Sequence, residues 1–445
     1  MQRLALVVVS LIVLGGCHQD NPASCELPSN AGNGVCPGID APIDTPPPPP
    51  ECMMNSQCTD PSKAVCDTVL NGGTCVQCTA TSAAACTDTT PACINDVCAP
   101  CTRHADCVDS NVCLPDGKCA NASDVAYLDG GGKDQMMCTR AMPCTKIDKA
   151  AMAKAILKIS GTLTERAVLD GRDVMILADP NAKLAPTMDG AALELRQGKV
   201  RIYDLEISGS LKEGLFVNDD QAEVELTRVS LLANTTDGAR VNAGHLTCSR
   251  CTIARNTLRG INLTAGEVTI SRSVIRDNMG GGILIGVNGI FQIVANFIFG
   301  NGSAGSLTGG INAPALDGND ANRIDFNSIS HNNASGVAGI QCSSGMALTA
   351  KYNILWKNGA VDQVAGNCAH VSSDIGLLPA SPTASNFNLD PGFVNEATGD
   401  LHLKSDSPVR RLVQGADVSG IAASDFDGDP RTVPMVDLGA DQTPP

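Results

Sequence analysis

A cluster of carboxylates in the middle of the chain could bind a metal ion and support catalysis. Asp219 and Asp220 are followed by Glu223 and Glu225, and Arg240 comes twenty residues after Asp220. Carboxylate oxygens are the ligands that Ca²⁺ prefers, so the cluster could hold Ca²⁺ beside an arginine that acts as the base of a β-elimination. Carboxylates also gather on surfaces without metals, and a solvated loop is the favoured interpretation. No cofactor is therefore expected, and Ca²⁺ remains an option.

Arginines suggest a second kind of chemistry, the binding of an acidic polymer. Residues 228–276 contain seven arginines and no lysine, opposed only by Asp237 and Glu267, which is a local charge of +5 in a chain of formal charge −16. Arg228, Arg250 and Arg272 recur every 22 residues. Arginines stacked in this way could meet an acidic polysaccharide by repeated bidentate contacts. The alternative, which we favour slightly, is an ordinary solvated surface. The acidic chain as a whole is a poor candidate for binding nucleic acid.

Other residues that could do chemistry have weaker patterns. Asp425–Asp429 has alternate carboxylates and a glycine, as calcium loops do, but lacks the downstream glutamate, so a turn is expected. His245 and His331 lie outside any triad pattern and are expected on the surface. Phe297 and Trp356 are expected to face outward and could stack on sugar rings, but two scattered aromatics do not make a platform, and packing under a loop is the alternative.

These residues lie on a repeat that must position them. Between Val200 and Asn358, apolar or small residues recur seven times at positions i, i+2, i+5 and i+7, with Ser or Asn at i+10. Two period-2 runs joined by a two-residue corner do not form an amphipathic helix, and a repeat of 22–31 residues indicates stacked units. A further apolar pair after i+10 predicts three short strands in each coil of an all-β solenoid. Arg228, Arg250 and Arg272 occupy i+4, on one corner.

The i+10 position is the column Asn234, Asn256, Asn278, Asn301, Asn332 and Asn358. One interpretation is a ladder in which each buried amide hydrogen-bonds its neighbours above and below. The other is that Asn simply tolerates left-handed turn geometry.

The repeat resembles the right-handed parallel β-helix family. The segment CTRAMPCTKIDKAAMAKAILKISGTL, residues 138–163, is similar to the helix and first strand that cap such proteins. The stretch LDPGFVNEATGDLHLKSDSPV, with residues 425–442, resembles the C-terminal segment of choice-of-anchor surface proteins. Polysaccharide lyases and glycoside hydrolases occur in the β-helix family, but the second carboxyl that inverting hydrolysis needs is missing here.

The N-terminus indicates export and a lipid anchor. A short basic start precedes the apolar run LALVVVSLIVL, which is too short to span a bilayer, and then Leu14–Cys17. This arrangement resembles a bacterial lipobox, which implies acylation of Cys17 and attachment to the membrane. His18 follows the cysteine, a pattern that resembles sorting to the outer membrane of a Gram-negative bacterium. An ordinary cleaved signal peptide is the alternative.

The 20 cysteines other than Cys17 are expected to form disulfides, because the chain is exported. Twelve of them form three four-cysteine units in residues 52–119, which lack the paired histidines of a zinc finger, and their connectivity stays open. Cys25–Cys36 and Cys138–Cys144 are expected pairs. Cys248 and Cys251 face inward across one corner and are expected to bridge each other.

Cys342 and Cys368 are 26 residues apart, the same as the advance from Asn327 to Asn353. Equal advances predict the same position in adjacent coils, with Cα atoms about 4.8 Å apart, within reach of a disulfide.

The expected organisation is a signal peptide (1–16), a lipidated, proline-rich linker (17–51), disulfide repeats (52–119), an N-terminal cap (120–163), the β-helix (164–375) and a C-terminal cap segment (376–445). We expect a lipid-anchored surface protein whose solenoid binds carbohydrate or another envelope polymer. A polysaccharide lyase or glycoside hydrolase is the alternative.

Overall fold

The computed structural model describes residues 49–444, with gaps at 70–71, 80–81, 83–85, 88, 135–136, 317–318, 320, 346–347, 360–362, 377–384, 415, 417 and 432–433. Cys17, Cys25 and Cys36, and with them the expected signal peptide and most of the linker, lie outside these residues. Within the described part, no helix is long and apolar enough to cross a membrane.

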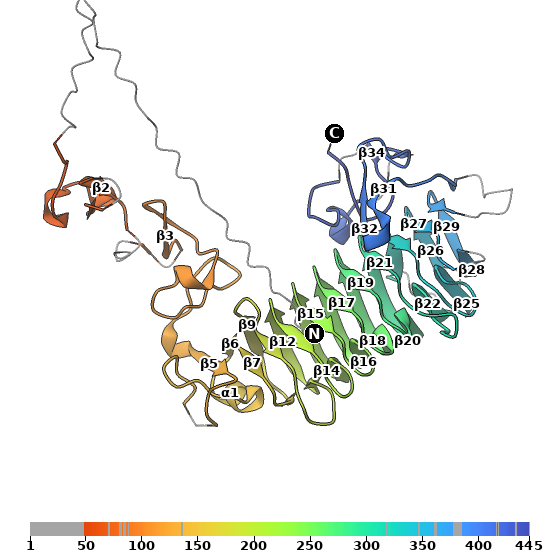
Figure 1. Ribbon diagram of the computed structural model, residues 1–445, viewed down its shortest axis with the longest axis horizontal. Helices are drawn as coiled ribbons and strands as arrows, with labels where there is room; N and C mark the ends of the chain where they lie inside the picture. The colour runs from red at the N-terminus through yellow and green to blue at the C-terminus, as the bar shows by residue number, and fades with distance from the viewer. Residues whose placement is uncertain are drawn as a thin grey trace, which may run out of the picture. The chain divides into compact units, whose positions relative to one another are not determined.

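The central part of the chain is a parallel β-helix, as the repeat predicts (Figure 1). Each coil pairs with the next in parallel: Val200 lies opposite Val224, Val224 opposite Leu246 and Leu246 opposite Val268. Side chains at these positions are at most 1 % exposed, because alternate residues of every strand point into the solenoid. The apolar positions of the repeat therefore form one continuous core.

Two sheets line the solenoid in the described residues. The ten-stranded sheet contains β7 (Thr162–Leu163), β10 (Lys183–Leu184), β13 (Glu206–Ser208), β15 (Ser230–Leu232), β17 (Thr252–Ala254), β19 (Val274–Arg276), β21 (Phe297–Phe299), β24 (Ser328–Ser330), β27 (Ile354–Trp356) and β30 (Asp374–Ile375). The path of the sixteen-stranded sheet is β5 (Val125–Asp129), β6 (Ile156–Ser160), β9 (Val174–Ala178), β12 (Gly198–Tyr203), β14 (Leu215–Thr227), β16 (Ala239–Ser249), β18 (Arg259–Ser271), β20 (Gly281–Val294), β22 (Ile311–Leu316), β25 (Ile340–Gly345) and β28 (Val364–Gly366). Beside this path lie β8 (Ala167–Leu169), β11 (Leu193–Leu195), β23 (Arg323–Asp325), β26 (Leu348–Lys351) and β29 (Cys368–Val371).

The central coils do not have three separate strands, so this part of the prediction is wrong. In β14, the third apolar pair of one coil and the first pair of the next lie on one strand of 13 residues. The strand bends at a bulge, where its register with β16 shifts after Val217. Gly244 and Gly266 stand at the equivalent bends with φ of 80° and 89°. A Cβ atom on Gly244 would lie 2.4 Å from the carbonyl oxygen of Ala222, so the bend requires glycine there.

The asparagine column forms the ladder that was one of the two interpretations. Asn278 is fully buried, and its Oδ1 accepts hydrogen bonds from the backbone N–H (3.1 Å) and the side-chain amide (2.8 Å) of Asn256. Its own amide donates to the Ile253 carbonyl (3.0 Å) and to Asn301 Oδ1 (2.8 Å). The same contacts join the whole column: Asn234, Asn256, Asn278, Asn301, Asn332 and Asn358. The ladder satisfies the buried polar groups of the corner.

A second ladder follows the other corner, at i+5, and the repeat did not reveal it. The backbone N–H of Ser273 donates to Asn296 Oδ1, that of Asn296 to Asn327 Oδ1, and that of Asn327 to Asn353 Oδ1. In both ladders, counted from Asn234 and from Ser273 onward, the residue immediately before each member has a positive φ. Examples are Ala233 (53°) and Arg272 (53°). The ladders thus hold corners whose backbone is unfavourable for most residue types.

The helix α1 (Ile147–Ala153) covers the N-terminal end of the solenoid. It buries Ile147, Ala150 and Ala151 in the same core as Leu157 and Leu163, which agrees with the expected capping helix. The Cys138–Cys144 disulfide joins this cap, with Cα atoms 5.0 Å apart.

The C-terminal segment packs along the outside of the ten-stranded sheet (Figure 1). It contains β31 (Phe393–Asn395), β32 (Asp400–Leu403), β33 (Val413–Gln414) and β34 (Met435–Val436). Leu401, Leu403 and Leu438 form a core with the outward-facing side chains of Phe297 and Phe326. This core is separate from the interior of the solenoid.

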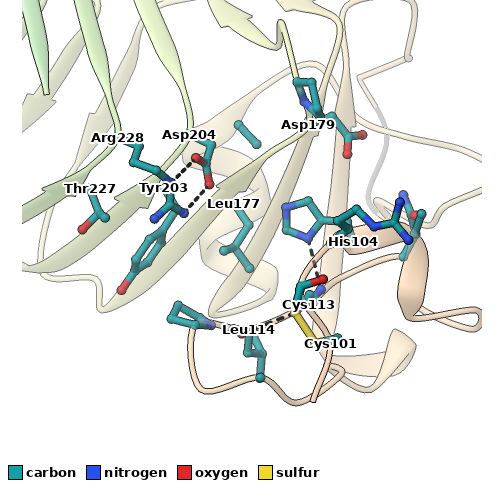
Figure 2. A pocket seen from close by; sticks show the side chains of 18 residues that line it. Cys101, His104, Cys113, Leu114, Leu177, Asp179, Tyr203, Asp204, Thr227 and Arg228 are labelled. Carbon is teal, nitrogen blue, oxygen red and sulfur yellow. Dashed lines mark hydrogen bonds and ion pairs between the residues drawn. A yellow bond between two sulfur atoms is a disulfide. The ribbon is translucent and has the colours of Figure 1, made fainter. Parts of the chain in front are cut away.

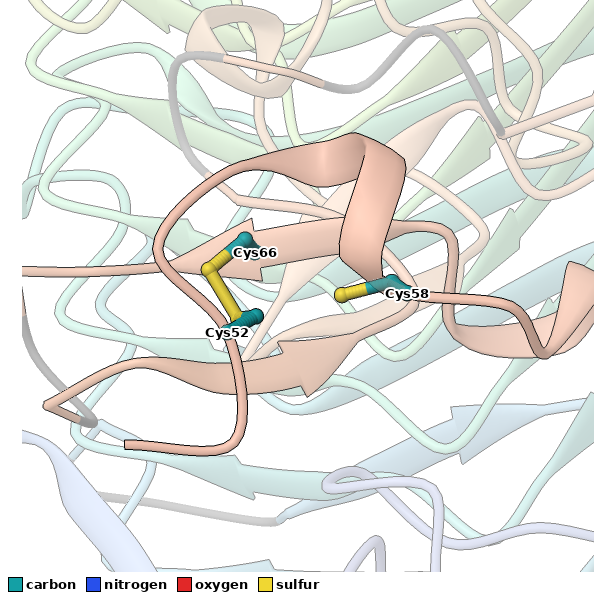
Figure 3. Close-up of side chains that lie close together, drawn as sticks. All are labelled: Cys52, Cys58 and Cys66. Carbon is teal, nitrogen blue, oxygen red and sulfur yellow. A yellow bond between two sulfur atoms is a disulfide. The ribbon is translucent and has the colours of Figure 1, made fainter. Parts of the chain in front are cut away.

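The cysteine-rich region consists of three similar units without a large core. Each unit joins its first cysteine to its third and its second to its fourth: 52–66 and 58–75, 78–93 and 86–98, 101–113 and 107–119. The first two units contain the hairpins β1 (Val65–Asp67) with β2 (Thr74–Val76) and β3 (Ala92–Ile94) with β4 (Val97–Ala99). Figure 3 shows Cys52, Cys58 and Cys66 close together, with Cys52 bonded to Cys66. These sulfurs are consumed by disulfides and do not form a zinc site.

Cys342 and Cys368 form a disulfide with Cα atoms 5.5 Å apart, but the register argument behind it is wrong. Cys342 lies opposite Gly366, and Cys368 lies opposite Leu348. The last coil is shorter than the one before it, since the advance from Leu348 to Cys368 is 20 residues and not 26. The disulfide therefore joins two positions of adjacent coils that are not equivalent. Cys248 and Cys251 bridge each other in the core, with Cα atoms 6.0 Å apart.

Candidate functional site

The three arginines of the sequence analysis stack at one corner of successive coils. The backbone N–H of Arg228 donates to Ser249 and that of Arg250 to Ser271, so the three residues hold equivalent places. The coil before Arg228 contributes Asp204 to the same column, with a φ of 63°. We call Asp204, Arg228, Arg250 and Arg272 the corner row. Stacked coils are about 4.8 Å apart, so the row presents charged groups at nearly regular intervals.

The guanidinium groups of the corner row have different surroundings. Arg228 forms a bidentate ion pair with Asp204, with Nε–Oδ1 at 2.6 Å and a second nitrogen–oxygen contact at 2.8 Å, and this raises the pKa of Arg228. Arg250 is exposed, and no carboxylate pairs with it in the described part of the chain. Arg250 is therefore the cation of the row that is most available to a ligand.

Arg272 lies under the C-terminal segment, which the sequence did not indicate. Its Nε donates to the Phe426 carbonyl (3.3 Å), and burial lowers its pKa, with a further contribution from Arg250. A Cβ atom on Gly428 would lie 2.0 Å from a terminal nitrogen of Arg272, so the loop backbone rests on the guanidinium. In the next coils the corner position changes to Ala295 and Phe326, which are fully buried under the same segment. The accessible part of the row therefore ends at Arg250.

At its other end the corner row opens into a cavity of about 960 Å³ between the third cysteine unit and the first coils (Figure 2). The coils contribute Leu177, Tyr203 and Thr227 beside Arg228 and Asp204, and the cysteine unit contributes Leu114 and Pro115 among others. Tyr203 is partly buried, and burial raises its pKa. An aromatic ring beside an Arg–Asp pair offers an apolar face together with donors and acceptors, which is the combination that sugars require.

His104 lies against the wall of this cavity and joins the cysteine unit to the coils. Its Nδ1 accepts the backbone N–H of Cys113 (3.1 Å), and its ring also contacts the Ala178 carbonyl. Burial lowers the pKa of His104, and the cation of Lys158 lowers it further. Lys158 is itself nearly buried and pairs with Asp179 at 2.7 Å. Tyr127 adds a hydrogen bond from its hydroxyl to the Ser110 carbonyl (2.6 Å), so the third unit is docked by polar contacts as well as by packing.

The structure does not bring the candidate catalytic residues together. Arg240 contacts Asn242 (3.0 Å) and Glu213 (3.7 Å), and no ion pair joins it to Asp219 or Asp220 in the described residues. Asp219 uses Oδ1 to accept the backbone N–H of Gln221, as surface turns do.

The two glutamates of the same cluster are also engaged. Lys199 pairs with Glu223 (2.5 Å) and with Glu225 (2.6 Å). The geometry thus supports the solvated-surface interpretation of this cluster over a calcium site.

The remaining sequence candidates have structural partners. Phe297 is 2 % exposed and stacks on Phe426 with ring centres 3.9 Å apart, so it packs under the C-terminal segment and is not open to sugars. Trp356 is partly buried against the same core. His245 pairs with Glu267 (3.1 Å) at the surface. Asp425 is buried and caps its own turn by accepting the backbone N–H groups of residues 428 and 429.

Comparison with known proteins supports the fold. Residues 213–374 match the model of the family described as "Right handed beta helix region", and residues 15–125 match a "Family of unknown function (DUF8331)". No curated protein shows significant similarity to the chain.

Among solved structures, pectate lyase Pel9A matches with 15 % identity and a TM-score of 0.43, covering 71 % of this chain and 95 % of that one. A likeness this distant carries no argument about activity. The parallel pairing of the coils and the matched region together show that the chain contains a right-handed parallel β-helix fold, preceded by a disulfide-rich region.

Proposed function

We propose that the protein is a lipid-anchored surface protein that binds an acidic polysaccharide along the corner row. The observation that carries this proposal is the stack of Arg228 and Arg250 at one corner, beside the cavity that contains Tyr203. A polymer of uronic acid sugars would lie across the coils, with carboxylates on the arginines and one sugar against the tyrosine ring.

The energetics favour a polymer over a single sugar. An exposed arginine–carboxylate contact is worth roughly 0–1 kcal/mol, so one contact would not hold a ligand. The contacts with Arg228, Arg250 and the Tyr203 ring would add up along one polymer through multivalency, and the two ionic contacts weaken as salt screens them. Arg228 shares its guanidinium with Asp204, which keeps the side chain extended along the row and leaves its other terminal nitrogen for a ligand.

The anchor is part of the proposal. Acylation of Cys17 would hold the protein at the outer membrane, and the proline-rich linker with the disulfide units would carry the solenoid away from it. A long spacer suits a protein that binds an extended polymer.

The test is affinity electrophoresis of the protein in gels that contain polygalacturonate, alginate or a neutral glucan. We expect retardation in the acidic gels only, decreasing as salt rises. Arg250→Ala should weaken retardation by about two- to fivefold, from the roughly 0.5–1 kcal/mol of one surface contact. Arg196→Ala is the control, because it removes an exposed arginine (52 %) that lies outside the corner row.

Equal retardation of wild type and Arg250→Ala, or equal retardation in neutral gels, would rule out the corner row. The same incubations are read for unsaturated products and new reducing ends. Their appearance would replace the binding role by the lyase or hydrolase alternative.

A further inference from the structure

Three side chains of the C-terminal segment bring a histidine nitrogen and two carboxylates to one point. His402 lies on β32, Asp427 lies in the loop after the buried Asp425, and Asp441 lies near the end of the chain. One ligand atom from each of the three lies within 4.8 Å of the other two. His402 Nε2 is 3.1 Å from Asp427 Oδ2. Residues separated by up to 39 positions thus converge on a volume of the size of one ion.

The imidazole of His402 is oriented as a metal ligand is. Its Nδ1 lies 2.5 Å from Asp400 Oδ1, so in the tautomer that has its proton on Nδ1 the N–H donates to this carboxylate and the lone pair of Nε2 is directed into the cluster. A carboxylate behind the ligating histidine fixes the tautomer and raises the basicity of the ligand. The ring is also held edge-on against Phe297 and Phe426, with ring centres 4.9 Å and 5.5 Å away.

Asp441 places a mostly buried carboxylate in the cluster. The residue is 6 % exposed, and its Oδ2 accepts the backbone N–H of Leu403 at 2.7 Å. No donor reaches its Oδ1 within the described residues. Asp427 is half-exposed and leaves the cluster open to solvent on one side.

We propose that His402, Asp427 and Asp441 form a binding site for one divalent transition-metal ion of the Zn²⁺ type, with Asp400 as the carboxylate behind the histidine. Three protein ligands and an open position are typical of zinc sites that retain a water molecule. The imidazole argues against Ca²⁺, which prefers an all-oxygen set. The ion would join β32 to the loop and to the chain end, and so hold the C-terminal segment over Arg272.

A protonated imidazole is the competing explanation. Four carboxylates influence the charge of His402 or of its carboxylate partners: Asp400, Asp425, Asp427 and Asp441. A proton on Nε2 could neutralise part of this negative charge in place of a metal ion. The two explanations differ in whether the protein takes up zinc.

The experiment is isothermal titration of chelator-treated, tag-free protein with ZnCl₂, with CaCl₂ in a parallel titration and the thermal midpoint recorded with and without Zn²⁺. We expect one Zn²⁺ per chain, weak or no Ca²⁺ binding, and a higher midpoint with Zn²⁺. Asp427→Asn, at the exposed ligand, should weaken zinc binding at least tenfold without unfolding the segment. Asp400→Asn should weaken it by about 10–100-fold.

His245→Ala is the control for the histidine variants, because His245 pairs with one carboxylate at the surface and should leave zinc binding unchanged. Absence of saturable uptake, or uptake that Asp427→Asn and Asp441→Asn do not affect, would overturn the metal site. A thermal midpoint that does not change with Zn²⁺ but falls as pH rises would show that a protonated His402, and not a metal ion, stabilises the cluster.

Discussion

Replacing one rung of the asparagine ladder should destabilise the solenoid more than any surface change. Asn278→Ala removes four side-chain hydrogen bonds, two accepted by Oδ1 and two donated by the amide. The Asn256 N–H then loses its side-chain acceptor, and the Ile253 carbonyl loses its side-chain donor, in a fully buried corner. A buried polar group without a partner costs about 1–3 kcal/mol, so we expect a loss of roughly 3–5 kcal/mol in the free energy of unfolding.

The measurement is guanidinium chloride unfolding followed by circular dichroism, with the midpoint and slope compared between variants. Asn242→Ala is the control, since Asn242 is a partly exposed amide whose side chain, among the described residues, bonds Arg240 and Asn218. It should cost less than about 1 kcal/mol. If the two variants unfold at the same midpoint, the ladder does not stabilise the fold in the way described.

Three further outcomes follow from particular groups. Burial raises the pKa of Asp374 from 3.8 to about 7, so its ionisation opposes folding increasingly as pH rises from about 4 to 7, by at most roughly 4 kcal/mol. Asp374→Asn should therefore stabilise the protein at pH 8 and much less at pH 4, and equal effects in thermal melts at both values would contradict this. Burial keeps the pKa of His104 below its usual 6.5, so docking of residues 101–119 should weaken as pH falls below about 6.5. Protection of this segment from hydrogen exchange, corrected for the intrinsic pH dependence of exchange, should then decrease, and protection that stays constant down to pH 5 would exclude the effect. Cys17→Ala should release the protein from washed membranes, and its retention there would refute the lipid anchor.

The interior of the solenoid was predictable because its pattern is local. Val224 and Leu226 point inward for the same reason as Val268 and Ile270. The asparagine column offered a ladder as one of two interpretations, and the structure decided between them. The second ladder, at i+5, was not predicted, because Asn296, Asn327 and Asn353 occupy a position that is apolar or small in the earlier coils. The bend within β14 depends on a bulge, which apolar spacing does not encode.

Contacts across long stretches of sequence could not be predicted. The shorter last coil shifted the register of Cys342 and Cys368 although both cysteines still meet. Arg272 appeared equivalent to Arg250 in the repeat, and only the contact with Phe426, 154 residues away, distinguishes them. The sequence therefore predicted that the arginines form a column. It could not predict which of them are accessible.

Arginine-specific labelling with phenylglyoxal, read by mass spectrometry at each residue, tests the binding role of the corner row most directly. Without ligand, Arg250 should react fastest and Arg272 slowly, since Arg250 is exposed and Arg272 is partly covered. With the acidic polysaccharide that retards the protein most, labelling of Arg250 and Arg228 should fall while labelling of Arg196 stays unchanged. Equal protection of Arg196 and Arg250, or protection of neither, would contradict binding along the corner row.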